Sequence, residues 1–81
     1  MSNNIVLSKA QKKILKELSD KEAGENSFKI SAQTGISYSY VCNMLGVLKE
    51  LEYVEKVRLG RTSKVFKITD AGFHAFMKSG F

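Results

Sequence analysis

The side chains best suited to specific hydrogen bonding lie close together in the middle of the chain. Positions 37–43 carry four hydroxyl groups and one amide, from Ser37, Tyr38, Ser39, Tyr40 and Asn43. These groups donate and accept hydrogen bonds without carrying charge. They suit recognition of the polar edges of another molecule. The sequence suggests no base that would activate one of the hydroxyls as a nucleophile.

A second group of functional side chains is cationic. Between Val54 and Lys67 there are five bases and one acid, Glu55, so this segment supplies +4 of the net charge of +5. The bases are Lys56, Arg58, Arg61, Lys64 and Lys67. A basic excess favours a polyanionic partner. A charge run is usually a solvated surface, but this one coincides with an expected protruding turn, which favours contact.

Residues suited to metal or redox chemistry are few. His74 is the single histidine and Cys42 the single cysteine, and no cysteine pair or carboxylate cluster has metal-ligand spacing. We therefore expect no metal, no cofactor and no enzyme activity. His74 is expected at the surface or packed, and Cys42 half-buried. A lone cysteine favours a reducing compartment over a disulfide-stapled secreted domain.

The size and composition of the chain indicate one domain. Its 81 residues are 43% hydrophobic and include no proline, which is typical of a globular unit over residues 1–81. No apolar stretch approaches the roughly 20 residues of a membrane span, and the N-terminus lacks the pattern of a signal peptide. We expect a cytoplasmic protein without membrane contact. Oligomerisation would help a domain this small, because its core is limited.

The elements that position these side chains begin with a helix expected over residues 8–23. Ser8 and Gln11 have the spacing of a capping box, and Gly24 provides a stop. A second helix is expected over residues 27–34, with Asn26 or Ser27 as its cap. The apolar side chains of these helices are Ala10, Ile14, Leu15 and Leu18 in the first, and Phe28 and Ile30 in the second.

A third helix is expected over residues 37–52. On a 100° helical wheel its buried stripe contains Val41, Met44, Leu45 and Leu48, while Ser39 and Asn43 lie on the opposite side. A β-hairpin is expected over residues 54–68, with its turn at Gly60–Ser63. A last helix is expected over residues 69–79, capped by Thr69-Asp70.

The segment Ile30–Ser37 resembles the helix-turn-helix of winged-helix regulators. There, a short helix ends in a pair such as Thr34-Gly35, and a hydroxyl residue such as Ser37 opens the recognition helix. Leu48–Val54, the hairpin and Phe66–Gly72 are similar, in that order, to segments of MarR-like and PadR-like repressors. The resemblance covers residues 8 to about 78. One position departs from it: Glu52 stands where the family usually has glycine, so we expect a different exit from the recognition helix.

The resemblance implies an α+β, mostly helical fold. It is a winged helix-turn-helix with a three-helix core, a two-stranded β-hairpin wing and a C-terminal helix. It also implies a sequence-specific double-stranded DNA-binding transcription regulator, a repressor acting as a homodimer in the cytoplasm at the nucleoid. A winged-helix module for protein–protein interaction, or an architectural DNA-binding protein with little sequence preference, remains an alternative.

The resemblance also assigns the contacts with DNA. The recognition helix enters the major groove, and the wing holds phosphates. The DNA-binding residues it implies are Lys29, Ser37, Tyr38, Ser39, Tyr40, Asn43, Arg58, Arg61, Thr62, Ser63 and Lys64.

An apolar surplus at the two ends of the chain predicts how the homodimer forms. It comprises Ile5, Val6, Leu7, Phe73, Phe76, Met77 and Phe81. An exposed patch of this kind marks an interface, so we expect a homodimer joined through the C-terminal helix. The alternative is that these residues close the core of the monomer.

Overall fold

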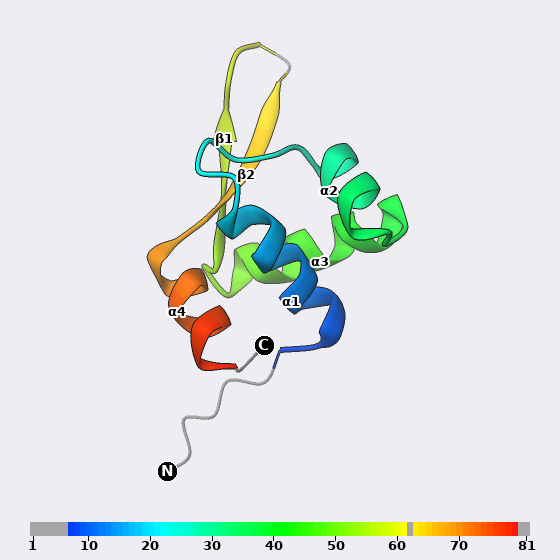
Figure 1. Cartoon of the computed structure of the whole chain (residues 1–81). Coiled ribbons are helices and arrows are strands. Elements are labelled where there is room, and N and C mark those ends of the chain that lie inside the picture. The colour runs from blue at the N-terminus through cyan, green and yellow to red at the C-terminus, as the bar shows by residue number, and fades with distance from the viewer. Residues whose placement is uncertain (1–6, 62, 80–81) are drawn as a thin grey trace.

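The computed structural model describes residues 7–61 and 63–79. Its helices are α1 (Lys9–Ser19), α2 (Ser27–Thr34), α3 (Tyr38–Glu50) and α4 (Asp70–Lys78), and its strands are β1 (Val54–Arg58) and β2 (Lys64–Ile68). Figure 1 shows the hairpin projecting from a body formed by the helices. The predicted order and types of the elements are confirmed; the ranges predicted for α3 and α4 also took in flanking cap residues. Among the described residues, no helix combines the length and apolar character needed to cross a membrane.

The core lies where one face of each of the first three helices meets the others. The predicted stripes supply seven of its fully buried side chains, which are Ile14, Leu15 and Leu18 from α1, Ile30 from α2, and Val41, Leu45 and Leu48 from α3; Val54 of β1 adds another. Met44 is partly buried against them. Each aliphatic side chain of this size contributes about 1.5–3 kcal/mol when it leaves water. The helical spacing of these residues therefore determines how the three helices pack.

The two ends of the described chain close this core. Leu7 and Phe76 both belong to the buried cluster, so the expectation that they form part of an exposed surplus is wrong. One side of α4 packs on the helical body and takes Phe76 with it. Phe73 and Met77 remain 47% and 62% exposed. The other members of the predicted surplus, Ile5, Val6 and Phe81, lie outside the described residues.

Side-chain caps fix where the helices begin. Ser8 Oγ accepts the Gln11 N–H at 3.2 Å while the Ser8 N–H donates to Gln11 Oε1 at 2.8 Å, which is the predicted capping box. Of the two candidates for α2, Asn26 is the cap, and its Oδ1 accepts a backbone N–H at 2.8 Å. Thr69 Oγ1 accepts the Gly72 N–H at 3.0 Å and starts α4. Each such cap stabilises its helix by about 1 kcal/mol.

The first helix is shorter than predicted, because it ends at Ser19 and not at residue 23. The Lys21 N–H donates to the Leu18 carbonyl at 3.1 Å, and the Gly24 N–H donates to the Lys21 carbonyl at 2.9 Å. Gly24 has φ 91°, so it ends this additional turn and not the helix. Residues 20–23 contain no helix breaker. The helix α1 ends early because Glu25, the residue after Gly24, pairs with β2.

That contact is an antiparallel β-bridge between Glu25 and Phe66. The Glu25 N–H donates to the Phe66 carbonyl at 3.0 Å, and the Phe66 N–H donates to the Glu25 carbonyl at 2.9 Å. A Cβ on Gly24 would lie 2.7 Å from Lys67 Cγ and 2.9 Å from Val65 Cγ2. Glycine therefore lets the loop after α1 approach β2 closely enough to pair with it.

The exit of α3 is a Schellman motif built around Glu52, which has φ 65°. The Glu52 N–H donates to the Lys49 carbonyl at 2.9 Å, and the Tyr53 N–H donates to the Leu48 carbonyl at 2.8 Å. Thr69 Oγ1 donates to the Glu52 carbonyl at 2.7 Å. The expectation that Glu52 alters the helix exit is therefore wrong. These hydrogen bonds hold a non-glycine residue in the left-handed conformation that glycine usually occupies.

Gly72 allows the first turn of α4 to lie against the start of the hairpin. A Cβ at this position would overlap the carbonyl oxygen of Tyr53 and lie 3.0 Å from Ile68 Cγ1. The same Tyr53 carbonyl accepts the Thr69 N–H at 3.0 Å. The position of α4 thus depends on the absence of a side chain at residue 72.

We expect Gly72→Ala to lower the free energy of unfolding by about 1–3 kcal/mol, because the added methyl group forces the backbone apart. Gly46→Ala is the matched control, since Gly46 is also helical but its Cβ would meet nothing within 4 Å. That variant should be more stable than the parent by about 1 kcal/mol. Urea denaturation followed by circular dichroism measures both. Similar changes in the two variants would contradict this account of α4.

Candidate nucleic-acid interface

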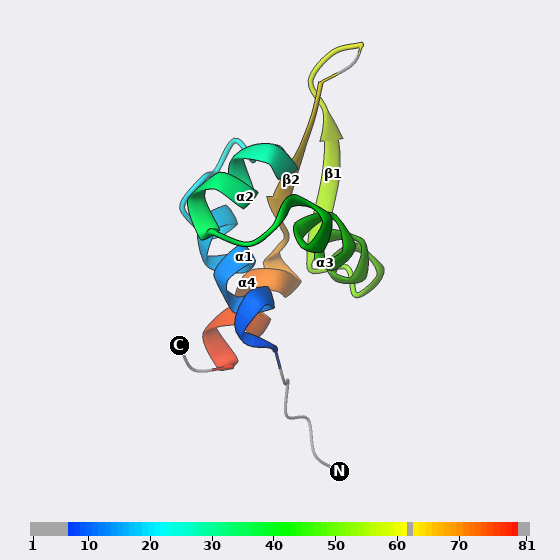
Figure 2. The same cartoon turned by 90° about the vertical axis from the view of Figure 1, so that its right-hand side faces the viewer.

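A groove of about 800 Å³ lies between the hairpin and the starts of α2 and α3. Four exposed lysines from separate segments line it, namely Lys21, Lys29, Lys56 and Lys64. Glu25 is the one acid among the described residues of the lining. In both Figure 1 and Figure 2, the far end of β1 reaches beyond the helices. The fold therefore gathers positive charge beside a projecting hairpin, an arrangement that attracts anions.

The structure brings four of the eleven predicted site residues to this groove: Lys29, Tyr38, Ser63 and Lys64. Six others are exposed but do not line it: Ser37, Ser39, Tyr40, Asn43, Arg58 and Arg61. Ser37 has a local role, because its Oγ accepts the Tyr40 N–H at 3.3 Å and caps α3. Thr62 lies outside the described residues.

The outward face of α3 is polar and carries little charge. Val41, Leu45 and Leu48 point into the core, and the opposite side exposes Ser39, Asn43, Gly46 and Glu50. A Cβ added to Gly46 would meet nothing within 4 Å, so this face is open in its middle. Such a helix presents hydrogen-bonding groups to a partner, while the neighbouring groove supplies the charge.

Phe28 departs from its predicted place, because it is 75% exposed and not part of a buried face. Ile30 is the buried residue of α2. Residues two positions apart in a helix point about 200° away from each other, so Phe28 and Ile30 cannot share one face. The periodicity of so short a helix could have signalled this outcome.

Two other residues were of interest in the sequence. Cys42 is exposed and lines the groove, so the prediction of a half-buried cysteine is wrong: the residue faces an opening that no helix covers. His74 is exposed. Among residues 7–61 and 63–79, no three His, Cys, Asp or Glu side chains are grouped to hold a metal ion.

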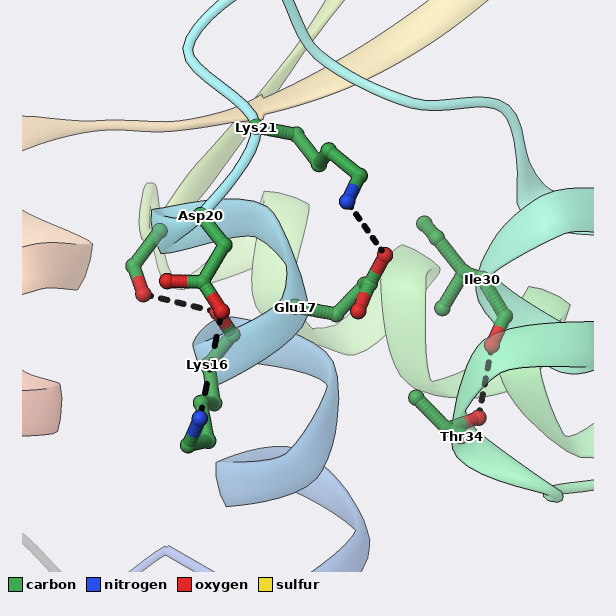
Figure 3. A network of polar contacts seen from close by, with 7 residues as sticks. Lys16, Glu17, Asp20, Lys21, Ile30 and Thr34 are labelled. Carbon is green, nitrogen blue, oxygen red and sulfur yellow. Dashed lines mark hydrogen bonds and ion pairs between the residues drawn. The ribbon is translucent and has the colours of Figure 1, made fainter.

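Glu25 is a buried carboxyl group beside the basic groove. Its residue is only 7% exposed, and its Oε1 is buried without a hydrogen-bond partner. The pKa of Glu25 is raised from 4.5 to about 7. Burial away from water is the largest cause; a hydrogen bond with Glu17 and the charge of Glu17 also raise the pKa, while Lys21 and Lys29 lower it. Figure 3 shows Lys21 directed at Glu17, with 3.6 Å between Nζ and Oε2.

No local pattern in the sequence predicts this carboxyl pair. Glu17 and Glu25 lie eight positions apart, on either side of a turn. Glu25 is buried because its backbone pairs with Phe66, a residue from the far end of the chain. Because the two residues are so far apart in the chain, the sequence around Glu25 shows no pattern that would mark it as buried.

Comparisons with known proteins place this geometry among solved structures. Neither the scan of protein-family models nor the search of curated proteins finds a match. Solved structures match over nearly the whole chain. The PcaV transcriptional regulator from Streptomyces coelicolor superposes with a TM-score of 0.84 at 19% identity, covering 96% of this chain and 58% of that one.

A second match is ZitR, a zinc-responsive MarR family member from Lactococcus lactis, with a TM-score of 0.81 and 22% identity over 95% of this chain and 54% of that one. A ZitR variant in complex with DNA also matches, with a TM-score of 0.80 and 20% identity over 95% of this chain and 53% of that one. The chain has a winged-helix fold. The structures it resembles are transcription regulators, and ZitR is a member of the MarR family. The chain spans just over half the length of these three.

The free energy of unfolding should fall as the pH rises from about 4.5 to about 7 because of Glu25. The pKa of its carboxyl group is about 7 in the folded chain and 4.5 for an unperturbed glutamate. Between these values the folded state holds one more proton than the unfolded state, so raising the pH favours unfolding. We expect this contribution to be about 1–3 kcal/mol. Glu25→Gln should remove it and make the protein more stable than the parent at pH 8.

Denaturant titrations between pH 4 and pH 8 measure this effect as the difference between parent and variant at each pH. Glu22→Gln is the control, because it removes the same charge from an exposed position. Its curve should follow the parent's. A constant offset between Glu25→Gln and the parent across the whole range would show that Glu25 titrates normally in the folded chain.

Proposed function

We propose that this chain is a sequence-specific, double-stranded DNA-binding domain of a transcription regulator, acting as a repressor. The observation that carries the proposal is the pairing of a polar, exposed α3 face with an adjacent groove lined by Lys21, Lys29, Lys56 and Lys64. The DNA-bound ZitR variant, which has the same fold, supports it. On this proposal the chain is not an enzyme, and it works in the cytoplasm at the nucleoid.

In this function α3 selects the site. A major groove admits one α-helix, and side chains on its outward face read the base edges. Ser39 and Asn43 lie on that face, one helical turn apart. An Asn side chain can bond with both the N6 and N7 positions of adenine, which discriminates against a wrong base by about 1–3 kcal/mol. Asn43 is therefore the base-reading residue of this proposal.

The groove and hairpin hold the phosphates. The lysines of the groove come from segments that precede and follow α3 in the sequence, and Arg58 and Arg61 extend the positive charge along the hairpin. Contacts of this kind fix the register of the protein on the duplex and carry no sequence information. The hydroxyls of Tyr38, Tyr40 and Ser63 are suited to the same task.

The proposed assembly is a homodimer through α4. Phe73 and Met77 lie four residues apart, so they share one face of this helix, and both are exposed. A two-fold axis beside that face would double the contact with DNA and cover the apolar surface. Two recognition helices about 34 Å apart would then meet successive major grooves on one side of the duplex.

The first prediction of this function concerns salt. If about 4–6 phosphates are contacted per subunit, the logarithm of affinity should fall with the logarithm of salt concentration with a slope of about −4 to −5 per subunit. Arg61→Ala should weaken binding equally for all sequences and reduce the slope by about 1. Fluorescence anisotropy with labelled duplexes measures both. A slope near zero for the parent protein would exclude a phosphate-based interface.

The second concerns specificity. A preferred duplex is selected from a random pool, and its affinity is compared with that of random DNA. Asn43→Ala should narrow the ratio of the two affinities by about 5- to 150-fold, because one base contact is lost, while the salt slope stays unchanged. Arg61→Ala is the control that lowers both affinities together. If the parent protein binds the preferred duplex and random DNA with nearly equal affinity, it is an architectural DNA-binding protein and not a sequence-specific one.

The third concerns the dimer. Sedimentation equilibrium at micromolar concentration should give a dimer mass for the parent and a monomer mass for Met77→Asp, because a carboxylate cannot be buried in an apolar contact without a partner. Leu59→Asp is the matched control, since Leu59 is 63% exposed but lies beside the hairpin turn. It should remain dimeric. A parent that sediments as a monomer would rule out the α4 interface.

A further inference from the structure

Two exposed aromatic rings lie against one another where α2 and α3 begin. Phe28 is 75% exposed and Tyr38 is 50% exposed. Their ring centroids are 5.6 Å apart with an interplanar angle of 78°, an edge-to-face arrangement. Such a contact holds two rings in a defined relative orientation. Phe28 and Tyr38 thus form a small apolar surface, the aromatic ledge, that the fold does not cover.

The aromatic ledge borders the basic groove. Tyr38 lines the groove, and so do Ser27 and Lys29, the residues on either side of Phe28. Tyr38 is also the first residue of α3, directly before the polar face that carries Ser39. The aromatic ledge therefore lies between the helix face assigned to base reading and the lysines assigned to phosphates.

The surroundings decide which partner fits the ledge. A protein partner would favour an apolar surface that extends further, whereas here cationic and hydroxyl side chains surround two rings. DNA offers a matching combination of charge and a small apolar group. The thymine 5-methyl group projects into the major groove, and phenylalanine is among the side chains that contact it.

We propose that the aromatic ledge receives a thymine 5-methyl group, which makes Phe28 a specificity-determining residue. Tyr38 is a positioning residue, because its ring holds the ring of Phe28. This inference rests on the proposed DNA-binding function and extends it to a base that α3 alone does not read. Burial of one methyl group is worth about a fourfold change in affinity per contact.

The test uses the preferred duplex selected from the random pool, with each thymine replaced in turn by deoxyuridine. Deoxyuridine keeps the base pair and lacks only the methyl group. The parent protein should lose affinity about fourfold at one thymine of each half-site. Phe28→Ala should bind the thymine and deoxyuridine duplexes equally, and it should retain the parent's affinity for random DNA and its salt slope.

Two further variants separate the methyl contact from an effect on folding. Tyr38→Phe keeps both rings and should keep the discrimination between thymine and deoxyuridine. Phe28→Leu keeps an apolar side chain at an exposed position, so the fold is retained and part of the discrimination should remain. Thermal unfolding curves check that each variant is folded.

Three results would overturn the inference while leaving the proposed function standing. These are a parent protein insensitive to deoxyuridine at every position, a Phe28→Ala variant that still discriminates, and an equal loss of affinity for all sequences in that variant. The last would place Phe28 against the sugar–phosphate backbone. A parent protein that binds no duplex would overturn both.

Discussion

The geometry of the molecule depends on the pair of backbone hydrogen bonds between Glu25 and Phe66, at 3.0 and 2.9 Å. A two-stranded hairpin is only marginally stable by itself. Here Glu25 pairs with β2 on the edge opposite β1, as one residue of a third strand would. This pairing ties the hairpin to the turn between α1 and α2. The groove exists because that tie sets the hairpin at a fixed distance from the starts of α2 and α3. Gly24 makes the approach possible, and the burial of Glu25 is its electrostatic cost.

A second set of hydrogen bonds, from the side chain and the backbone of Thr69, joins the base of the hairpin to the helices. The exit of α3 at Glu52, the entry of β1 at Tyr53 and the start of α4 at Thr69 share hydrogen bonds of 2.7 and 3.0 Å. These explain why a glutamate is tolerated in the left-handed conformation, which costs a non-glycine residue about 1 kcal/mol or more. The hairpin is thus held at its base and at the middle of β2, which sets its direction relative to α3.

The features that could be predicted from the sequence are those with local causes. The capping box at Ser8, the Thr34-Gly35 stop and the stripe of Val41, Leu45 and Leu48 determine the helices over short distances along the chain. The exposure of Phe28 also has a local cause, because its spacing from Ile30 puts the two side chains on different faces of α2. The exposure of Cys42 and the burial of Leu7, Phe76 and Glu25 depend instead on which distant segment covers them. The hairpin meets the loop after α1 over some forty residues of sequence, and no periodicity within either segment encodes that contact. Eleven site residues could be named in advance, but the groove that collects four of them could not.

Three residues that break local rules lie on the proposed interface or beside it, whereas Glu52 breaks one at the exit of α3. Gly46 costs about 1 kcal/mol in a helix interior compared with alanine, Phe28 exposes an apolar ring, and Glu25 buries a carboxyl group. Each lies on the outward face of α3, beside the groove or in its lining. The helix α1, by contrast, has a complete capping box and a fully buried stripe. Departures of this kind are expected where a surface is shaped for a partner and stability is sacrificed to it. The positions of Phe28 and Glu25 at the basic groove, and of Gly46 on the outward face of α3, are an argument for function that is independent of the charge itself.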